Sequence, residues 1–258
     1  MKALVTGAGA RLGQAMALYL GGRGYDVAVH YAGSKDGADD TVAQLHAMGR
    51  EACALRADLL DENATQTLIP RAVETLGGPL ICLINNASIF EYDNVETGTR
   101  ESWDRHMESN LRAPFVLTQQ FAAQVPEPAM DDRDEPVARG LVINMLDQRV
   151  HKLTPEFMSY TIAKMGLWAM TRTSAQALAP RVRVNGIGPG PTLRGHRQST
   201  AHFDKQRAAT ILKRGANPKD ITAALGYFLD APAVTGQMLA VDGGQHLAWE
   251  TPDVLGVE

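Results

Sequence analysis

Residues 2–13 of the chain read KALVTGAGARLG, and this stretch decides the fold. A short apolar strand at 3–6 runs into a turn with Gly7 and Gly13, and an amphipathic helix is expected over 12–23. Glycines at such a turn let the backbone approach a pyrophosphate, and the helix N-terminus offers free N–H groups. The stretch therefore predicts a dinucleotide-binding turn, the alternative being a tight turn without a ligand.

Outward from this turn, apolar runs of strand length alternate with longer segments of helical period. This alternation predicts a single α/β domain of Rossmann type, with a doubly wound parallel sheet of about seven strands and helices on both faces. Ligands of such sheets bind outside the carboxyl ends of the strands. The expected strands are 3–6, 27–31, 51–56, 80–84, 141–144, 182–186 and 238–241, and the expected helices are 12–23, 37–48, 62–76, 101–124 and 155–178.

The composition is that of a globular enzyme. The chain has 258 residues, 45% hydrophobic and 21% charged, and 1–258 is expected to form one domain whose core needs no disulfide or metal. The two cysteines, Cys53 and Cys82, lie in apolar runs and are predicted to be buried and reduced, which indicates a reducing compartment.

The charge and hydropathy patterns favour a cytoplasmic protein. With a net charge of −4, the composition does not indicate a basic surface that would bind nucleic acid. No apolar run reaches the length of a membrane span, and no secretory leader follows Lys2. The seven histidines show no ligand spacing, so no metal is expected.

Two segments interrupt the alternation of strands and helices. Residues 126–139 (PEPAMDDRDEPVAR) are rich in proline and acid and are predicted to be a surface insertion loop. Residues 188–210 begin GPGPTLRGHRQST and follow a strand, so they are expected at the ligand end of the sheet. We interpret this second segment as a substrate-binding loop or lid.

The end of the second strand favours NADP(H) as the cofactor. Folds that prefer NAD place an acid there to bind the ribose 2′-OH, whereas this strand ends His30-Tyr31 and continues to Ser34 without an acid. Arg11 and Ser34 are suited to a 2′-phosphate, because guanidinium matches phosphate geometry. The alternatives are a solvated arginine and a turn serine.

Further cofactor candidates follow the other strands. Asp58 and Leu59 come after the third strand, where Asp58 would reach the adenine edge. The paired asparagines at 85–86 after the fourth strand would face the cofactor, or they simply satisfy a turn. The predicted cofactor-binding residues are Gly7, Arg11, Leu12, Gly13, His30, Tyr31, Ser34, Asp58, Leu59, Asn85, Ala87, Ser88, Lys164, Pro189, Gly190 and Thr192.

The segment YTIAK at 160–164 provides a candidate catalytic pair. Tyr160 and Lys164 share one helix face at the i, i+4 spacing, and a nearby ammonium would lower the phenol pKa from about 10. Tyr31 and Lys35 have the same spacing. Only Tyr160 follows a strand that ends in a polar cluster, 144–147, and opens a long helix.

Together these motifs resemble the short-chain dehydrogenase/reductase family. The resemblance implies that Tyr160 is the general acid/base, that Lys164 binds the nicotinamide ribose and lowers the tyrosine pKa, and that Asn110 holds a proton-relay water. It also implies a homotetramer or homodimer built through the long helices and the last strand. The matching motifs are TGAGARLG at 6–13, NNAS at 85–88, Asn110, YTIAK at 160–164 and RVNGIGPG at 183–190.

Two departures from the family pattern are similar to the pteridine reductases, and dihydromonapterin reductases share part of them. Arg11 stands where the family usually has glycine, and Asp147 where it usually has serine. The resemblance implies that Phe90 stacks on a pterin opposite the nicotinamide; the alternative is core packing. The implied substrate-binding residues are Arg11, Ser88, Phe90, Asp147 and Tyr160, together with the His30-Tyr31 and Ser34 match beside the cofactor.

A physical argument supports a pteridine substrate. A carboxylate at Asp147 repels a developing alkoxide but helps to protonate the nitrogen of a C=N bond, as part of a coupled acid pair with Tyr160. The alternative for Asp147 is a loop carboxylate or helix cap. We therefore expect an NADPH-dependent pteridine or dihydropteridine reductase. The other hypotheses are a carbonyl reductase of a 3-oxoacyl thioester or another ketone, and a non-catalytic NADP-binding regulator, against which the intact Tyr160, Lys164 and Asn110 argue.

Overall fold

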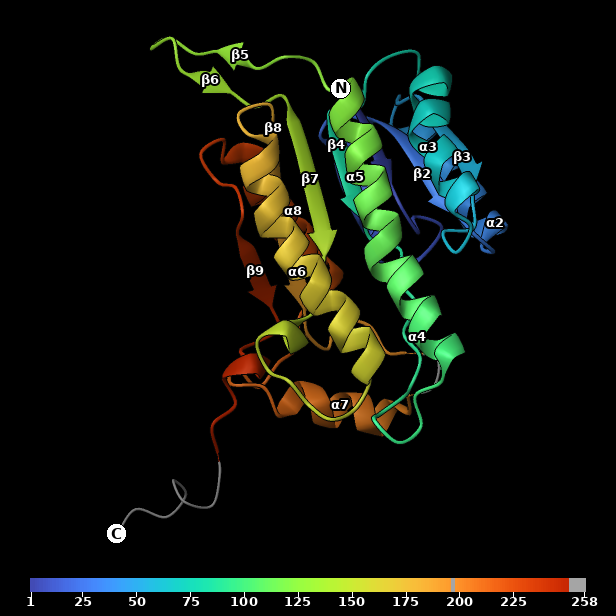
Figure 1. Cartoon of the computed structure of the whole chain (residues 1–258), viewed down its shortest axis with the longest axis vertical. Coiled ribbons are helices and arrows are strands. Elements are labelled where there is room, and N and C mark those ends of the chain that lie inside the picture. Colours follow the sequence, from blue (N-terminus) through green and yellow to red (C-terminus); the bar gives the residue numbers. More distant parts are fainter. Residues whose placement is uncertain (196–197, 251–258) are drawn as a thin grey trace.

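A sheet of seven parallel strands forms the middle layer of the protein, in the spatial order β3-β2-β1-β4-β7-β8-β9 (Figure 1). The coordinates are a computed structural model that describes residues 1–195 and 198–250. They confirm the single doubly wound α/β domain predicted from the sequence. The strands are β1 (Lys2–Val5), β2 (Asp26–Tyr31), β3 (Ala52–Arg56), β4 (Cys82–Asn85), β7 (Gly140–Met145), β8 (Val182–Pro189) and β9 (Met238–Val241).

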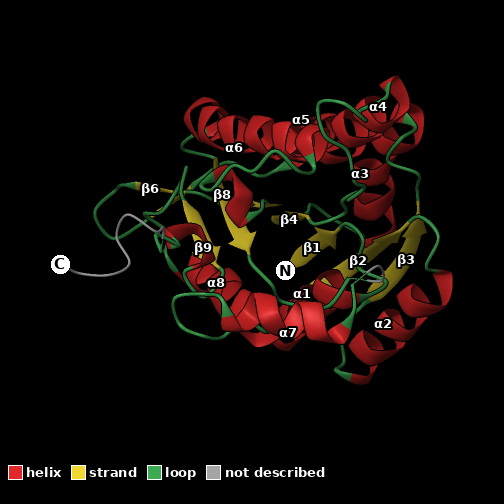
Figure 2. Ribbon diagram, turned by 90° about the horizontal axis from the view of Figure 1, so that it is seen from below, coloured by secondary structure: helices red, strands yellow, loops and turns green. Residues whose placement is uncertain are grey.

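Helices cover both faces of this sheet (Figure 2). One core contains side chains of α1, α2 and α8, and the other contains side chains of α3, α5 and α6. All six residues of β7 are buried, because each face of the strand packs against a core. The helices are α1 (Arg11–Gly22), α2 (Lys35–Ala47), α3 (Glu62–Leu76), α4 (Arg100–Met107), α5 (Ala113–Gln124), α6 (Met158–Leu178), α7 (Thr200–Ala208) and α8 (Pro218–Asp230).

The predicted helix over 101–124 is not one regular helix. It consists of α4, a π-helical turn at Glu108–Arg112 and α5. The turn contains Asn110, and such π turns often mark functional positions. The predicted helix over 155–178 begins later, at Met158, because Phe157 takes a left-handed conformation with φ of 57°.

Two helices, α7 and α8, were not expected from the sequence. The start of α8 nevertheless carries a recognisable signal: Pro218 is the first helical residue, and Asn217 and Asp220 form a capping box. α7 lies in the predicted 188–210 loop, where Ser199 accepts a hydrogen bond from the backbone N–H of His202. Residues 196 and 197 of that loop lie outside the described residues.

The predicted surface loop at 126–139 contains a small antiparallel hairpin. Its strands are β5 (Ala129–Met130) and β6 (Pro136–Val137), and Figure 1 shows it projecting at the end of the molecule where the strands of the main sheet begin. Asp131 holds the turn by accepting backbone hydrogen bonds from Arg133 and Glu135.

Two composition-based expectations are also addressed by the structure. Both cysteines were predicted to be buried. Cys82 is buried, whereas Cys53 is only partly buried. Both thiols are free.

In the part of the chain that the structure describes, no helix combines the length and apolar character of a transmembrane span.

Candidate active site

A cavity with a volume of about 1270 Å³ lies at the carboxyl ends of the strands. It extends from the glycine turn after β1 to the segments after β4, β7 and β8. The predicted site residues that line it are Gly7, Arg11, Leu12, Gly13, Tyr31, Ser34, Ala87, Ser88, Phe90, Asp147, Tyr160, Lys164, Pro189, Gly190 and Thr192. Five others, His30, Asp58, Leu59, Asn85 and Asn110, are not among the lining residues.

The glycine turn has the shape of a phosphate cradle. Gly7 has a φ of +63°, and a Cβ on Gly13 would lie 2.1 Å from the carbonyl oxygen of Gly7. Only glycine fits at both positions. Ala10, which precedes α1, supplies no side-chain cap, so the first N–H groups of the helix remain available to an anion.

His30 lies behind this turn rather than in the cavity. Its Nδ1 accepts the backbone N–H of Gly7 at 3.0 Å, and its Nε2 lies 3.1 Å from the carbonyl oxygen of Ala57. Because Nδ1 is the acceptor, the proton resides on Nε2 and the imidazole is neutral. Burial lowers the pKa of His30 to about 4, which keeps it neutral near pH 7. His30 therefore positions the glycine turn for the cofactor.

Arg11 connects the glycine turn to the loop after β8. Its guanidinium donates hydrogen bonds to the carbonyl oxygens of Leu193, at 3.0 Å, and Arg194, at 2.9 Å. Its backbone has a φ of 56°, a left-handed conformation that explains the family's usual glycine here. Contact of Arg11 with the 2′-phosphate or the substrate stays a prediction.

The remaining non-lining residues have structural contacts of their own. Asp58 is exposed and accepts the backbone N–H of Leu60, while Leu59 is buried in the core. Asn85 donates to Asn144 across β4 and β7 at 2.8 Å. The side chain of Asn110 makes two hydrogen bonds of 2.8 Å to the backbone of Ile89 and so fixes the segment that carries Phe90.

Tyr160 and Asp147 meet at the floor of the cavity. The Tyr160 hydroxyl donates to Oδ2 of Asp147 at 2.9 Å, and Oδ1 of Asp147 accepts the backbone N–H of Arg149. Burial raises the pKa of Asp147, and burial together with the Asp147 carboxylate raises the pKa of Tyr160 well above its ordinary value. Tyr160 therefore holds its proton at neutral pH and is arranged as a donor.

Lys164 lies beside the Tyr160 ring, one helical turn further along α6. Its ammonium donates to the carbonyl oxygen of Met145 at 2.7 Å and lies 5.6 Å from the centre of the Tyr160 ring. Burial lowers the pKa of Lys164 to about 8. Burial and the Asp147 carboxylate raise the pKa of Tyr160 in this structure. The lowering expected from the ammonium together with a bound, positively charged nicotinamide ring stays a prediction.

Phe90 forms an aromatic wall beside this pair. Its ring meets Tyr160 edge-on, with ring centres 4.7 Å apart, and 51% of the residue is exposed. The alternative of core packing for Phe90 is therefore wrong. Tyr92, Gln148, Arg149 and Phe157 also line the cavity, and the sequence analysis missed all four. They carry no motif, since only the folding of 146–158 over the segment after β4 brings them together.

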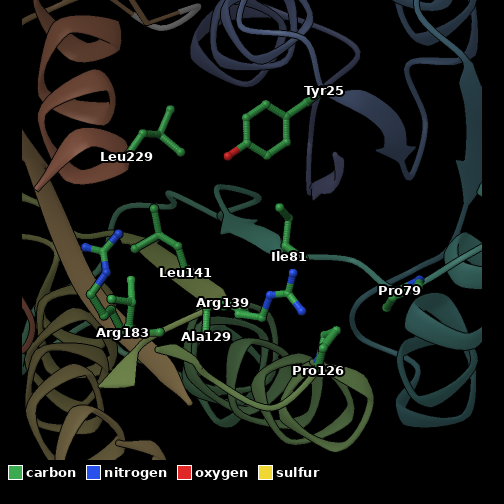
Figure 3. Close-up of a pocket in the computed structure, with 12 residues that line it drawn as sticks. Tyr25, Pro79, Ile81, Pro126, Ala129, Arg139, Leu141, Arg183 and Leu229 are labelled. Atoms are coloured by element: carbon green, nitrogen blue, oxygen red, sulfur yellow. The ribbon is translucent and has the colours of Figure 1, made fainter. Parts of the chain in front are cut away.

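A second cavity, of about 610 Å³, lies at the opposite, amino ends of the strands (Figure 3). Tyr25, Ile81, Leu141 and Arg183 line it, together with residues of the hairpin. The Arg183 guanidinium donates to three carbonyl oxygens at and beyond the end of α8, those of Phe228, Ala231 and Val234. No carboxylate side chain lines this cavity within the described ranges, so it lacks an acid–base pair like that of Tyr160 and Asp147.

The larger cavity has the features of a dinucleotide site. Across residues 1–195 and 198–250, no three or more His, Cys, Asp or Glu side chains are grouped to hold a metal ion. The uncapped helix, Gly7 with its positive φ, Gly13 without room for a Cβ and the adjoining Ser34 suit a dinucleotide. Fold and site together define an oxidoreductase of the nicotinamide class.

Comparison with known proteins gives the family. Residues 7–246 match the family described as Enoyl-(Acyl carrier protein) reductase. The 3-oxoacyl-[acyl-carrier-protein] reductase FabG of Staphylococcus epidermidis is 30% identical over 250 residues, 95% of this chain and 98% of that protein. The chain belongs to the short-chain dehydrogenase/reductase family.

Solved structures of related proteins extend this result to the cofactor. FolM alternative dihydrofolate reductase 1 from Brucella canis, complexed with NADP, is 41% identical, with a TM-score of 0.90, covering 98% of this chain and 96% of that one. The landomycin C-6 ketoreductase LanV with bound NADP and rabelomycin is 27% identical, with a TM-score of 0.83, covering 96% of each chain. The predictions of an enzyme and of NADP(H) as its cofactor are confirmed.

Proposed function

We propose that this NADP-dependent oxidoreductase reduces a pteridine or dihydropteridine. The observation that carries the proposal is the hydrogen bond of 2.9 Å between the Tyr160 hydroxyl and the Asp147 carboxylate. A carboxylate at this place disfavours a developing alkoxide and favours a substrate atom that takes up a proton, such as the nitrogen of a C=N bond.

The other groups of the cavity suit a flat heterocycle with N–H donors. Oε1 of Gln148 is buried and accepts no hydrogen bond from the described residues, although Gln148 lines the cavity. Together with Asp147 it offers acceptors to ring N–H and amino groups. The half-exposed Phe90 ring supplies an apolar surface on which a planar ring stacks. FolM from Brucella canis, named as a dihydrofolate reductase, supports the same substrate class.

In the proposed reaction, Tyr160 and Asp147 transfer protons and Lys164 binds the cofactor. When bound at the glycine turn, the cofactor would supply the hydride that a ring carbon of the substrate takes up. The Tyr160 hydroxyl donates its proton to the adjoining ring nitrogen, so the C=N bond gains one hydrogen at each atom. Asp147 orients that hydroxyl. After the transfer it takes up a proton from solvent and passes it to the Tyr160 phenolate, and burial, which raises the pKa of Asp147, favours this uptake. Lys164 remains largely protonated near neutral pH, since its pKa is about 8, and holds the ribose side of the cofactor.

The test is NADPH oxidation with dihydrobiopterin and dihydrofolate, with acetoacetyl thioester as the carbonyl substrate. We expect turnover of the pteridines, and a loss of about 100-fold in Asp147→Ser because a positioned acid contributes about that much. The FabG relatives favour the second candidate, a 3-oxoacyl reductase. Turnover of the thioester alone, retained or raised in Asp147→Ser, would replace the proposal with that activity.

A further inference from the structure

A row of side chains leads from the catalytic pair to a single guanidinium group. Phe90 meets Tyr160 edge-on, and Phe157 stacks on Phe90 with ring centres 4.3 Å apart and planes 9° from parallel. The guanidinium carbon of Arg149 lies 5.0 Å from the centre of the Phe157 ring. All four side chains line the same cavity, so a ligand bound at Tyr160 can extend along this row.

Arg149 is free to bind an anion. Its Nη1 donates to Oγ1 of Thr154 at 2.7 Å, and its other guanidinium donors remain for a ligand. No salt bridge within 1–195 and 198–250 involves Arg149. The side chain is partly buried against an aromatic ring, which makes a charge-assisted hydrogen bond there stronger than one in open water.

The backbone holds Phe157 where it is. Its φ of 57° is rare for a bulky residue, and strained conformations of this kind concentrate at ligand sites. Tyr92 adds a second ring, edge-on to Phe157 at 5.3 Å. Two carboxylates lie near this cluster: Asp147 accepts the backbone N–H of Arg149, and Glu156 raises the pKa of the Tyr92 hydroxyl. Within the described residues neither forms a salt bridge with the Arg149 guanidinium.

We propose that Arg149, Phe157 and Tyr92 form a subsite for an aromatic, carboxylate-bearing tail of the substrate. The rings contact the aromatic part of the tail, and the Arg149 guanidinium binds its carboxylate. The inference rests on the proposed function and sharpens it. It selects a pteridine with an anionic aryl tail, as in dihydrofolate, over one with a neutral hydroxylated tail, as in dihydrobiopterin.

The experiment compares both substrates in the holoenzyme with Arg149→Met and Arg149→Lys. Arg172→Met is the matched control, because Arg172 stacks on Trp168 at 5.8 Å outside the cavity and its loss changes the net charge equally. We expect Arg149→Met to raise the KM for dihydrofolate about tenfold more than the KM for dihydrobiopterin, the equivalent of one charge-assisted hydrogen bond. Arg149→Lys falls between, and Arg172→Met leaves both values unchanged.

The other outcomes overturn either the subsite alone or the proposed function as well. Equal changes for the two substrates, or none, overturn the subsite while dihydrobiopterin turnover keeps the proposed function. Turnover of neither pteridine by the unmodified enzyme overturns the proposed function and the subsite with it. A rise in the dihydrofolate KM that Arg172→Met reproduces shows a general charge effect and also overturns the subsite.

Discussion

The amino ends of the sheet's strands (the amino edge) and their carboxyl ends (the carboxyl edge) differ in how the buried polar groups beside them are satisfied. At the amino edge, the Arg183 guanidinium is bound by backbone carbonyls, and burial raises the pKa of Tyr25 to about 12 without any acid beside it in the cavity lining. At the carboxyl edge, the hydroxyl of Tyr160 meets a carboxylate and the lysine pKa falls to about 8. Burial alone therefore does not make a site; titratable groups that perturb one another beside a cofactor cradle do.

The largest expected effect separates the two buried tyrosines. Tyr160 and Tyr25 are 6% and 9% exposed, so they are matched in burial. Tyr160→Phe should lower kcat about 1000-fold by removing the proton donor. Tyr25→Phe should leave kcat within about twofold, because its hydroxyl faces the other cavity.

The measurement is steady-state turnover of the best pteridine found, together with NADPH affinity by fluorescence. Unchanged NADPH affinity in Tyr160→Phe shows that the cradle is intact. If the Tyr160→Phe enzyme were as active as the Tyr25→Phe enzyme, the conclusion that catalysis depends on the tyrosine at the carboxyl ends of the strands would be wrong.

The next effect concerns acid stability at the carboxyl edge. The folded pKa of His30 is about 4, below its ordinary 6.5, so the unfolded chain binds the extra proton first as the pH falls. The stability that His30 contributes is present above pH 6.5 and is lost as the pH falls towards 4. The loss is about 3 kcal/mol for a shift of this size.

Urea unfolding at pH 7 and near pH 4 measures this loss. His30→Gln should be less stable at pH 7 but should lose about 3 kcal/mol less on acidification than the unmodified protein. His46→Gln is the control, because His46 is exposed and should leave the pH dependence as it was. The same acid loss in both variants would show that His30 is not the responsible group.

The smallest effect tests the amino edge as a purely structural region. Arg183→Met removes the donors to three carbonyl oxygens at and beyond the end of α8 and should lower the free energy of unfolding by about 2 kcal/mol. Because the site lies at the other edge, kcat of the folded enzyme should not change. A lowered kcat at full folding would show that the two edges are coupled.

The architecture and much of the cavity lining were predictable, because local signals mark them. Gly7 stands between a strand and a helix, Gly13 lies in the first turn of that helix, and parallel strands bring their carboxyl ends together. The ends of the helices and the contacts between distant segments were harder to predict from the sequence. The helix over 101–124 contains a π turn that accompanies the Asn110–Ile89 contact, and no local periodicity predicts it.

The roles of individual residues divide in the same way. His30 was placed beside the cofactor by its strand-end position, but alternation along β2 turns it inward, behind Gly7. Arg149 and Phe157 gave no signal, since their proximity depends on how 146–158 folds across the cavity.

The sequence by itself determined the fold, the NADP(H) class and the presence of Tyr160, Lys164 and Asp147, because hydrophobic period, glycine conformation and i, i+4 spacing are local properties. The tertiary structure decided which charges face each other. Only the folded chain places the Asp147 carboxylate against the Tyr160 hydroxyl and ties Lys164 to Met145. The direction of the Tyr160 pKa follows from burial and distance, which are set when separate segments pack together.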